Sequence, residues 1–181
     1  DSHEIKGLIH YYLNEDGSDS TQIRVVPHIS RPVHIEKHLS WIEEARIKNL
    51  QSSCELWERR KEFFPHLELC ENIQDQLASR YGVQSRYFRQ LIDRLKQLNV
   101  FAGNWKSGSF NPHVLKEYGL TVSGESLKTL AKYSRERRFR LPDGRNEVFE
   151  MHIKTGDLRF HFFPDIESHR IYVGYIGPHL S

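Results

Sequence analysis

The sequence lacks several features that would place it in a protein class directly. It has only two cysteines, Cys54 and Cys70, and they lie outside any C-x-x-C pattern. This excludes a disulfide scaffold or a zinc ribbon and is typical of a chain in a reducing compartment. No apolar run approaches the roughly 20 residues of a membrane helix, and the chain does not open with a signal-like segment. We therefore expect a cytoplasmic protein with no membrane partner.

A strong charge of one sign is also missing. The formal net charge is +2, from 26 Lys and Arg against 24 Asp and Glu. A balance of this kind does not by itself indicate a nucleic-acid binder. The small basic excess lies from Ser123 onward, where Lys and Arg outnumber Asp and Glu by ten to eight. The charge thus directs attention to the C-terminal part of the chain.

The first 122 residues are predicted to be mainly helical, after a small β-hairpin. Residues 5–13 and 21–26 are rich in β-branched and aromatic side chains and flank the turn-rich stretch NEDGSDS. Helical spacing of apolar residues follows, interrupted at Pro65, Gly82 and Gly103. We interpret residues 1–122 as a helical extension or a partner-docking section.

Residues 123–181 are predicted to form a small α+β module. A short helix over residues 123–136, capped by Ser123, precedes four strand-like stretches at residues 137–141, 145–154, 158–163 and 169–176. The connections are short, which favours a four-stranded antiparallel meander packed on helices. The expected fold class is α+β, and the whole chain could also form one domain.

Cationic and aromatic side chains alternate with apolar ones along this meander. Because alternate residues of a strand share a face, one face carries His152, Lys154, Arg159, His161, Arg170 and Tyr172. Cations about 5 Å apart across strands repel one another unless an anion lies among them. Arg and Lys bind phosphate, His transfers protons near neutral pH, and Tyr offers a ring for base stacking. A solvated sheet face remains the alternative.

Two further patterns bear on binding. The stretch KYSRERRFR contains Arg137, Arg138 and Arg140, which could hold a nucleic-acid backbone or simply solvate a helix end. His34 and His38 have an i, i+4 spacing that can bind zinc, but they lack the H-E-x-x-H order and a third ligand. We therefore expect no metal site and no cofactor.

The order FEMHIK, GDLRFHFF, HRIYVGYIG resembles the C-terminal half of the RelE/ParE/HigB superfamily of bacterial toxins. The resemblance covers about one quarter of the chain. It implies helices packed on an antiparallel sheet and metal-free mRNA cleavage by Lys, Arg and a C-terminal Tyr or His. Lys154 and Arg159 match best by position, and His161, His179 and Tyr175 match more loosely. Tyr175 falls on the apolar side of its strand unless a bulge near Gly174 turns it over.

These observations lead to two functional hypotheses. The first is a nucleic-acid-binding protein of a bacterial toxin or defence system, with metal-independent endoribonuclease activity as the candidate reaction and RNA favoured over DNA. Its candidate catalytic residues are Lys154, Arg159, His161 and His152, and its candidate nucleic-acid-binding residues are Arg170, Tyr172, Arg137, Arg138 and Arg140. The alternative is a non-catalytic accessory subunit of a multiprotein antiviral defence or DNA-processing complex, with the N-terminal helices docking a protein partner. The sequence leaves open whether the chain is an enzyme.

Overall fold

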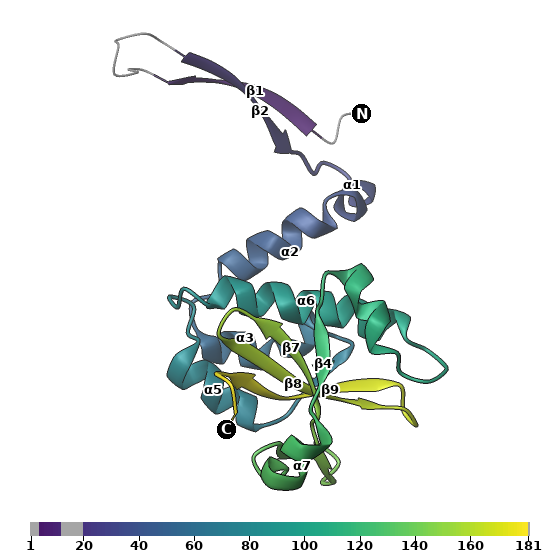
Figure 1. Cartoon of the computed structure of the whole chain (residues 1–181). Coiled ribbons are helices and arrows are strands. Elements are labelled where there is room, and N and C mark those ends of the chain that lie inside the picture. Colours follow the sequence, from purple (N-terminus) through teal and green to yellow (C-terminus); the bar gives the residue numbers. More distant parts are fainter. Residues whose placement is uncertain (1–3, 12–19, 181) are drawn as a thin grey trace. The chain divides into compact units, whose positions relative to one another are not determined.

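A computed structural model describes residues 4–11 and 20–180 of the chain. The chain divides into two units, residues 1–49 and residues 50–181, and many of their elements are labelled in Figure 1. Apart from Ser20, the predicted turn NEDGSDS lies outside the described residues. Each unit is treated separately below.

The first unit contains the predicted hairpin. Strands β1 (Glu4–Tyr11) and β2 (Ser20–Pro27) pair antiparallel, with Ile5 opposite Val26. Helix α1 (Pro32–Lys37) begins with a proline at its first turn, where no backbone N–H is needed. Helix α2 (Leu39–Lys48) follows after His38. The helical section predicted after the hairpin therefore begins with two helices that meet at His38.

Helices predominate in the first half of the second unit, and one of them is strongly amphipathic. In α6 (Phe88–Asn104) the side chains of Leu91, Leu95 and Leu98 recur on one face and are fully buried. The other helices of this unit are α3 (Ser53–Glu58), α4 (Arg60–Phe63), α5 (Asn72–Arg80), the 3₁₀ helix η1 (Pro112–Tyr118) and α7 (Leu127–Tyr133). The cap of α7 is Ser126, which accepts a hydrogen bond from the Thr129 N–H. The prediction of Ser123 as this cap is wrong, because Ser123 belongs to a strand.

A five-stranded mixed sheet forms the centre of the second unit. Its order is β3 (Leu67–Leu69), β9 (Arg170–Gly177), β8 (Leu158–Asp165), β7 (Met151–Thr155) and β4 (Val122–Gly124). Strands β7, β8 and β9 are the predicted antiparallel meander, and β3 joins β9 in parallel. The α+β class is confirmed. The sheet itself is larger than predicted because two short strands from the N-terminal side add to its edges.

The first predicted strand of the meander does not enter this sheet. Strands β5 (Arg138–Arg140) and β6 (Asn146–Val148) form a separate two-stranded sheet. The predicted strand over residues 145–154 is interrupted at residues 149 and 150. The Phe149 N–H still donates to the carbonyl oxygen of Arg137 and extends the β5–β6 ladder, and the chain then enters β7 in the other sheet. The prediction of one four-stranded meander is therefore wrong in this detail.

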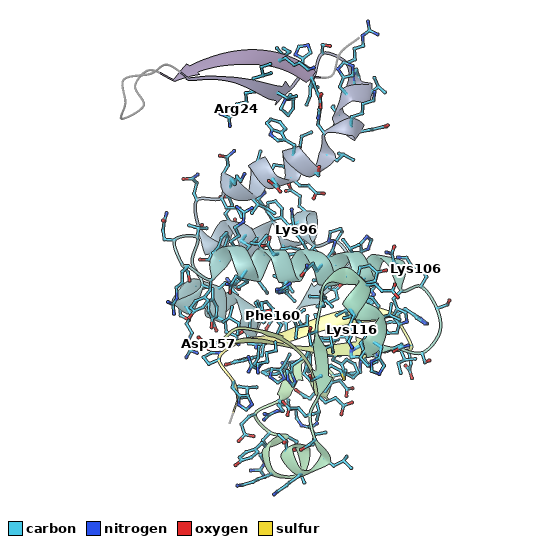
Figure 2. The ribbon with its side chains drawn as sticks, turned by 45° about the horizontal axis from the view of Figure 1, so that its top comes forward. Arg24, Lys96, Lys106, Lys116, Asp157 and Phe160 are labelled. Carbon is cyan, nitrogen blue, oxygen red and sulfur yellow. The ribbon has the colours of Figure 1, made fainter. Side chains whose placement is uncertain are left out.

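One face of the five-stranded sheet is apolar and lies against helices. Ile153, Phe160, Phe162 and Val173 are almost fully buried on this face. Figure 1 shows α6 along one side of the sheet and α7 on the opposite side. Phe160 of β8 lies between the sheet and α6 (Figure 2). The polar alternate residues of the same strands therefore point toward the side of α7.

The five-stranded sheet crosses the predicted boundary between the two sections of the chain. Strand β3 and residue Val122 of β4 lie before the predicted boundary at residues 122 and 123, yet both belong to the same sheet as β7–β9. Within the described part of the chain, no helix is long and apolar enough to span a membrane.

Candidate functional site

The paired strands β7, β8 and β9 bring two histidines and a tyrosine together. His161 of β8 lies opposite His152 of β7 on one side and opposite Tyr175 of β9 on the other. The imidazole centroids of His152 and His161 are 5.2 Å apart, and the His161 and Tyr175 rings are 5.7 Å apart. Directly opposed residues of an antiparallel pair share a face. The three rings therefore form a row across the sheet.

A β-bulge places Tyr175 in this row. His161 pairs with Tyr175, whereas the next residue, Phe162, pairs with Val173, so Gly174 is the extra residue. A side chain at Gly174 would collide with Phe139 and Phe149, because an added Cβ would lie 2.6 Å from a ring carbon of each. The bulge on which the Tyr175 prediction depended is thus present. It changes the strand phase so that Tyr175 faces the histidines.

Glu125 completes the row from the neighbouring strand. Its N–H donates to the carbonyl oxygen of Glu150, which extends the β4–β7 ladder and puts Glu125 on the face of His152. One carboxylate oxygen, Oε1, lies 3.6 Å from Nδ1 of His152. Among the described residues, this Nδ1 is a buried polar atom without a hydrogen-bond partner. It therefore has an acid group beside it at slightly more than hydrogen-bonding distance.

Arg137 lies behind Glu125 and has no exposed surface. Its Nε donates to Glu125 Oε1 at 3.0 Å, and two further guanidinium nitrogens donate to the carbonyl oxygens of Tyr133 and Leu180 at 3.2 Å each. A buried cation needs such compensation by hydrogen bonds and an opposite charge. We call Glu125, Arg137, His152, His161 and Tyr175 the histidine cluster.

The electrostatics of the cluster favour neutral imidazoles. Burial lowers the pKa of His161 to about 4, although its hydrogen bond to the Phe149 carbonyl opposes this shift. Burial likewise lowers the pKa of His152, and the Glu125 carboxylate partly counteracts the effect. His179 is exposed, but its charge also lowers the pKa of His152. At neutral pH the imidazoles of His152 and His161 are therefore neutral, and each has a lone pair on one nitrogen.

The tautomer of His161 follows from its partner. Its Nδ1 lies 3.2 Å from the Phe149 carbonyl oxygen, which can only accept a hydrogen bond. The Nδ1 therefore carries the proton, and Nε2 holds the lone pair. With only 1% of its surface exposed, His161 cannot contact a bulky substrate directly. The prediction that His161 is catalytic is therefore corrected: it is a buried neighbour of His152.

Part of the predicted polar face is covered by aromatic side chains of the β5–β6 region. Phe139 stacks on Tyr175 with the ring centroids 6.2 Å apart, and it meets Phe149 edge-on. Tyr172 is buried in a cluster with Phe149, Leu141 and Cys70. Its ring is therefore closed to a nucleic-acid base, contrary to the sequence prediction. Arg137 is likewise not available to a phosphate backbone, because it is engaged inside the protein.

The remaining predicted cations lie at the surface in three groups: Lys154 with Arg159, Arg138 with Arg140, and Arg170 by itself. Lys154 is exposed opposite the half-buried Arg159, near the turn between β7 and β8 where Figure 2 labels Asp157. The Arg159 guanidinium donates to the carbonyl oxygens of Gly156 and Leu158 at 3.0 Å each. Arg138 and Arg140 are exposed on β5. Only the first group adjoins the histidine cluster along the strands.

Arg170 stands apart from the cluster. It begins β9, five residues before Tyr175, which corresponds to about 16 Å along an extended strand. It is 3.5 Å from Glu68 and lines a polar cleft of about 340 Å³ together with His66, Lys106 and His169. The predicted face therefore divides into a β7–β8 site and a separate basic cleft.

Glu125 is the functional candidate that the sequence analysis missed. It was assigned to a helix, whereas it follows a three-residue strand whose only sequence signal is the apolar Val122 before Ser123 and Gly124. No protein-family model matches the chain, and no curated protein or solved structure matches it significantly. The geometry of the cluster is therefore the structural observation that bears on function.

Proposed function

We propose that the chain binds RNA beside the β7–β8 turn and cleaves it without a metal ion, with His152 as the proton-transferring group. The observation that carries this proposal is the position of His152 between an orienting carboxylate and two cations. Glu125 lies 3.6 Å from its Nδ1, while Lys154 follows two residues later on the same strand and face, opposite Arg159. A base oriented by an acid beside phosphate-binding cations is the arrangement that acid–base cleavage requires.

The two nitrogens of His152 have different roles in this proposal. Nδ1 is buried beside Glu125, so the exposed part of the ring leaves Nε2 to meet a substrate. The lowered pKa keeps His152 neutral near pH 7, which is the form that accepts a proton. The His161 ring contacts the His152 ring from the other side, and Tyr175 in turn contacts His161. His152 is thus the catalytic residue, and Glu125 and His161 are positioning residues.

The proposed reaction balances without a metal. Nε2 of His152 takes the proton of the ribose 2′-hydroxyl, and the 2′-oxygen attacks the adjacent phosphorus. Arg159 and Lys154 stabilise the additional negative charge. The bond to the 5′-oxygen breaks, and that oxygen receives a proton from Lys154. The products are a 2′,3′-cyclic phosphate and a free 5′-hydroxyl. DNA lacks the 2′-hydroxyl and would be bound but not cut.

The test is RNA cleavage in EDTA, with labelled RNA and DNA of the same sequence. We expect His152→Ala to reduce the cleavage rate about 100-fold, which is the usual contribution of a general base. His113→Ala is the matched control, since His113 is an exposed histidine of η1, and we expect it to cleave like the wild type. Cleavage of DNA at the same rate as RNA, or equal rates for both variants, would contradict the proposed mechanism.

A role in a bacterial toxin or defence system is part of the same proposal and is supported by the resemblance to the toxin superfamily.

The second hypothesis, a subunit that docks a protein partner, is favoured by a specific observation in the first unit. Most of the exposed large apolar side chains in the described part of the chain lie there: Ile5, Ile23, Val25, Val26, Ile29, Val33, Ile35, Leu39 and Trp41. A two-stranded hairpin alone is only marginally stable in water, and apolar patches of this kind mark interaction sites.

Association through the hairpin can be tested by sedimentation velocity over a range of protein concentrations. Ile23 and Val25 are exposed and share one face of β2. With a second copy of this chain as the partner, we expect the wild type to self-associate and the double variant Ile23→Lys, Val25→Lys to remain monomeric. Leu127→Lys is the control, because Leu127 is 86% exposed but belongs to the second unit. Equal association of all three proteins would exclude the hairpin as the contact.

A further inference from the structure

Two imidazoles and a carboxylate of the histidine cluster converge in one place. Glu125, His152 and His161 each offer one donor atom, and these atoms all lie within 4.8 Å of one another. The donors of a tetrahedral zinc site are separated by about 3.3 Å, given bonds of about 2.0 Å. One separation, 3.6 Å between Glu125 Oε1 and His152 Nδ1, is already close to this value. Small side-chain rotations would bring the three donors to ligand distances.

We propose that Glu125, His152 and His161 bind one Zn²⁺ ion, or another divalent transition ion of similar preference. Two neutral imidazoles and one carboxylate are ligands that zinc accepts, with the fourth position open to water. The sequence predicted no metal site, because its pattern does not reveal that Glu125 neighbours the histidines.

A second observation supports the site independently of the spacing. Within the described chain, Nδ1 of His152 is the buried side-chain polar atom that has no hydrogen-bond partner. Leaving a buried polar atom unsatisfied costs about 1–3 kcal/mol. A cation bound at this nitrogen would satisfy it, and the Glu125 carboxylate beside it would offset the charge of the ion. Nδ1 of His152 thus lies beside the other two donor residues and makes no hydrogen bond that a metal would have to replace.

The surroundings already fix the orientation of two of the ligands. Nδ1–H of His161 donates to the Phe149 carbonyl, which leaves Nε2 as its only donor for a metal. Arg137 Nε holds one carboxylate oxygen of Glu125. Such outer contacts hold metal ligands in place in known sites. The positive charge of Arg137 opposes a cation, so we expect weaker binding than in a site with the same ligands and no neighbouring arginine.

Occupation of this site would inhibit the proposed cleavage, and this consequence rests on the proposed function. Coordination through Nδ1 leaves the proton of the His152 imidazole on Nε2. That nitrogen can then no longer accept the 2′-hydroxyl proton. The metal would also displace Glu125 from its place beside Nδ1. Zinc would therefore act as an inhibitor of a reaction that proceeds without metal.

Direct metal titration tests the site without reference to activity. Protein stripped with EDTA and freed of the chelator is titrated with Co²⁺, whose visible absorption reports four-coordinate binding, and Zn²⁺ is then used to displace it. We expect one equivalent to bind the wild type and the His113→Ala control. Affinity should fall at least tenfold in His152→Ala and in Glu125→Gln, with circular dichroism confirming that both variants are folded. No binding by the wild type, or unchanged affinity in both variants, would overturn the proposed site.

RNA cleavage by the same proteins separates this proposal from the proposed function. If cobalt binds as expected but RNA is never cut in EDTA, the metal site stands and the nuclease proposal fails. If RNA is cut in EDTA and no metal binds, the nuclease proposal stands and the metal site fails. Cleavage that continues with one equivalent of Zn²⁺ bound would overturn the inhibitory role.

Discussion

Replacing Arg137 with methionine should lower the free energy of unfolding by about 3–5 kcal/mol, the range found when one partner of a buried ion pair is removed. Arg137 is fully buried, and its loss would leave the Glu125 carboxylate in the interior without its cation. It would also leave the carbonyl oxygens of Tyr133 and Leu180 without their guanidinium donors. Methionine preserves much of the side-chain volume, so the loss would report charge and hydrogen bonds more than a cavity.

Urea unfolding followed by circular dichroism measures this effect. Arg138→Met is the matched control, because Arg138 is the next residue and is exposed; we expect a change within about 0.5 kcal/mol there. Adding Glu125→Gln to Arg137→Met should recover part of the loss, because the uncompensated charge is then removed. Similar losses for the Arg137 and Arg138 variants would show that the buried pair does not stabilise the fold.

The alternation of apolar and polar residues was sufficient to predict the meander of β7, β8 and β9. In each of these strands one face is buried in the core, and a two-residue period records that directly. Strand β3 could not be predicted in the same way. Leu69 also fits the helical spacing that continues through Ile73 and Leu77, and only pairing with β9 makes this segment extended. Three residues are too few for a period to distinguish the two structures.

The candidate site was predictable only where it depended on strand phase. The opposition of His152 to His161 and of Lys154 to Arg159 follows from the period and the tight turn between β7 and β8. The partnership of Glu125 with Arg137 depends instead on how α7 and the following turn return the chain to the sheet. Local patterns carry no information about such a return. The sequence therefore could not distinguish the buried Arg137 from the exposed Arg138 and Arg140 of the same basic stretch.

Phe149 shows why the exposure of the polar face was also beyond prediction. By strand phase it belonged with Met151 and Ile153 on the apolar face. Its N–H donates to the carbonyl oxygen of Arg137 in β5–β6 pairing, and its ring packs over Gly174 on the opposite side of the sheet. One break in a strand thus changed the face of a single aromatic residue and closed part of the surface. The remaining opening, beside His152, Lys154 and Arg159, is where the proposed function places RNA.

Acidification should destabilise the protein through His161 well before its carboxylates are protonated. Burial holds the pKa of His161 at about 4, against an ordinary value of 6.5. Between these values the unfolded chain binds a proton that the folded chain does not, so the free energy of unfolding falls as the pH falls. The full loss is on the order of 3 kcal/mol, since one pKa unit corresponds to about 1.4 kcal/mol. It should be complete below pH 4 and absent above about pH 7.

The groups facing His161 act in definite directions on this transition. Arg137 and His152 lower its pKa, whereas Glu125 and the Phe149 carbonyl raise it. His152 also has a lowered pKa and adds destabilisation of the same sign. Urea unfolding in EDTA at pH 6.5 and at pH 5 should show a loss of about 1.5 kcal/mol from His161. His161→Gln cannot titrate and should lose that much less over the same interval, although it is less stable at pH 7. An equal pH dependence of the two proteins would mean that His161 takes up its proton at the same pH in the folded and the unfolded chain, and burial would then not lower its pKa.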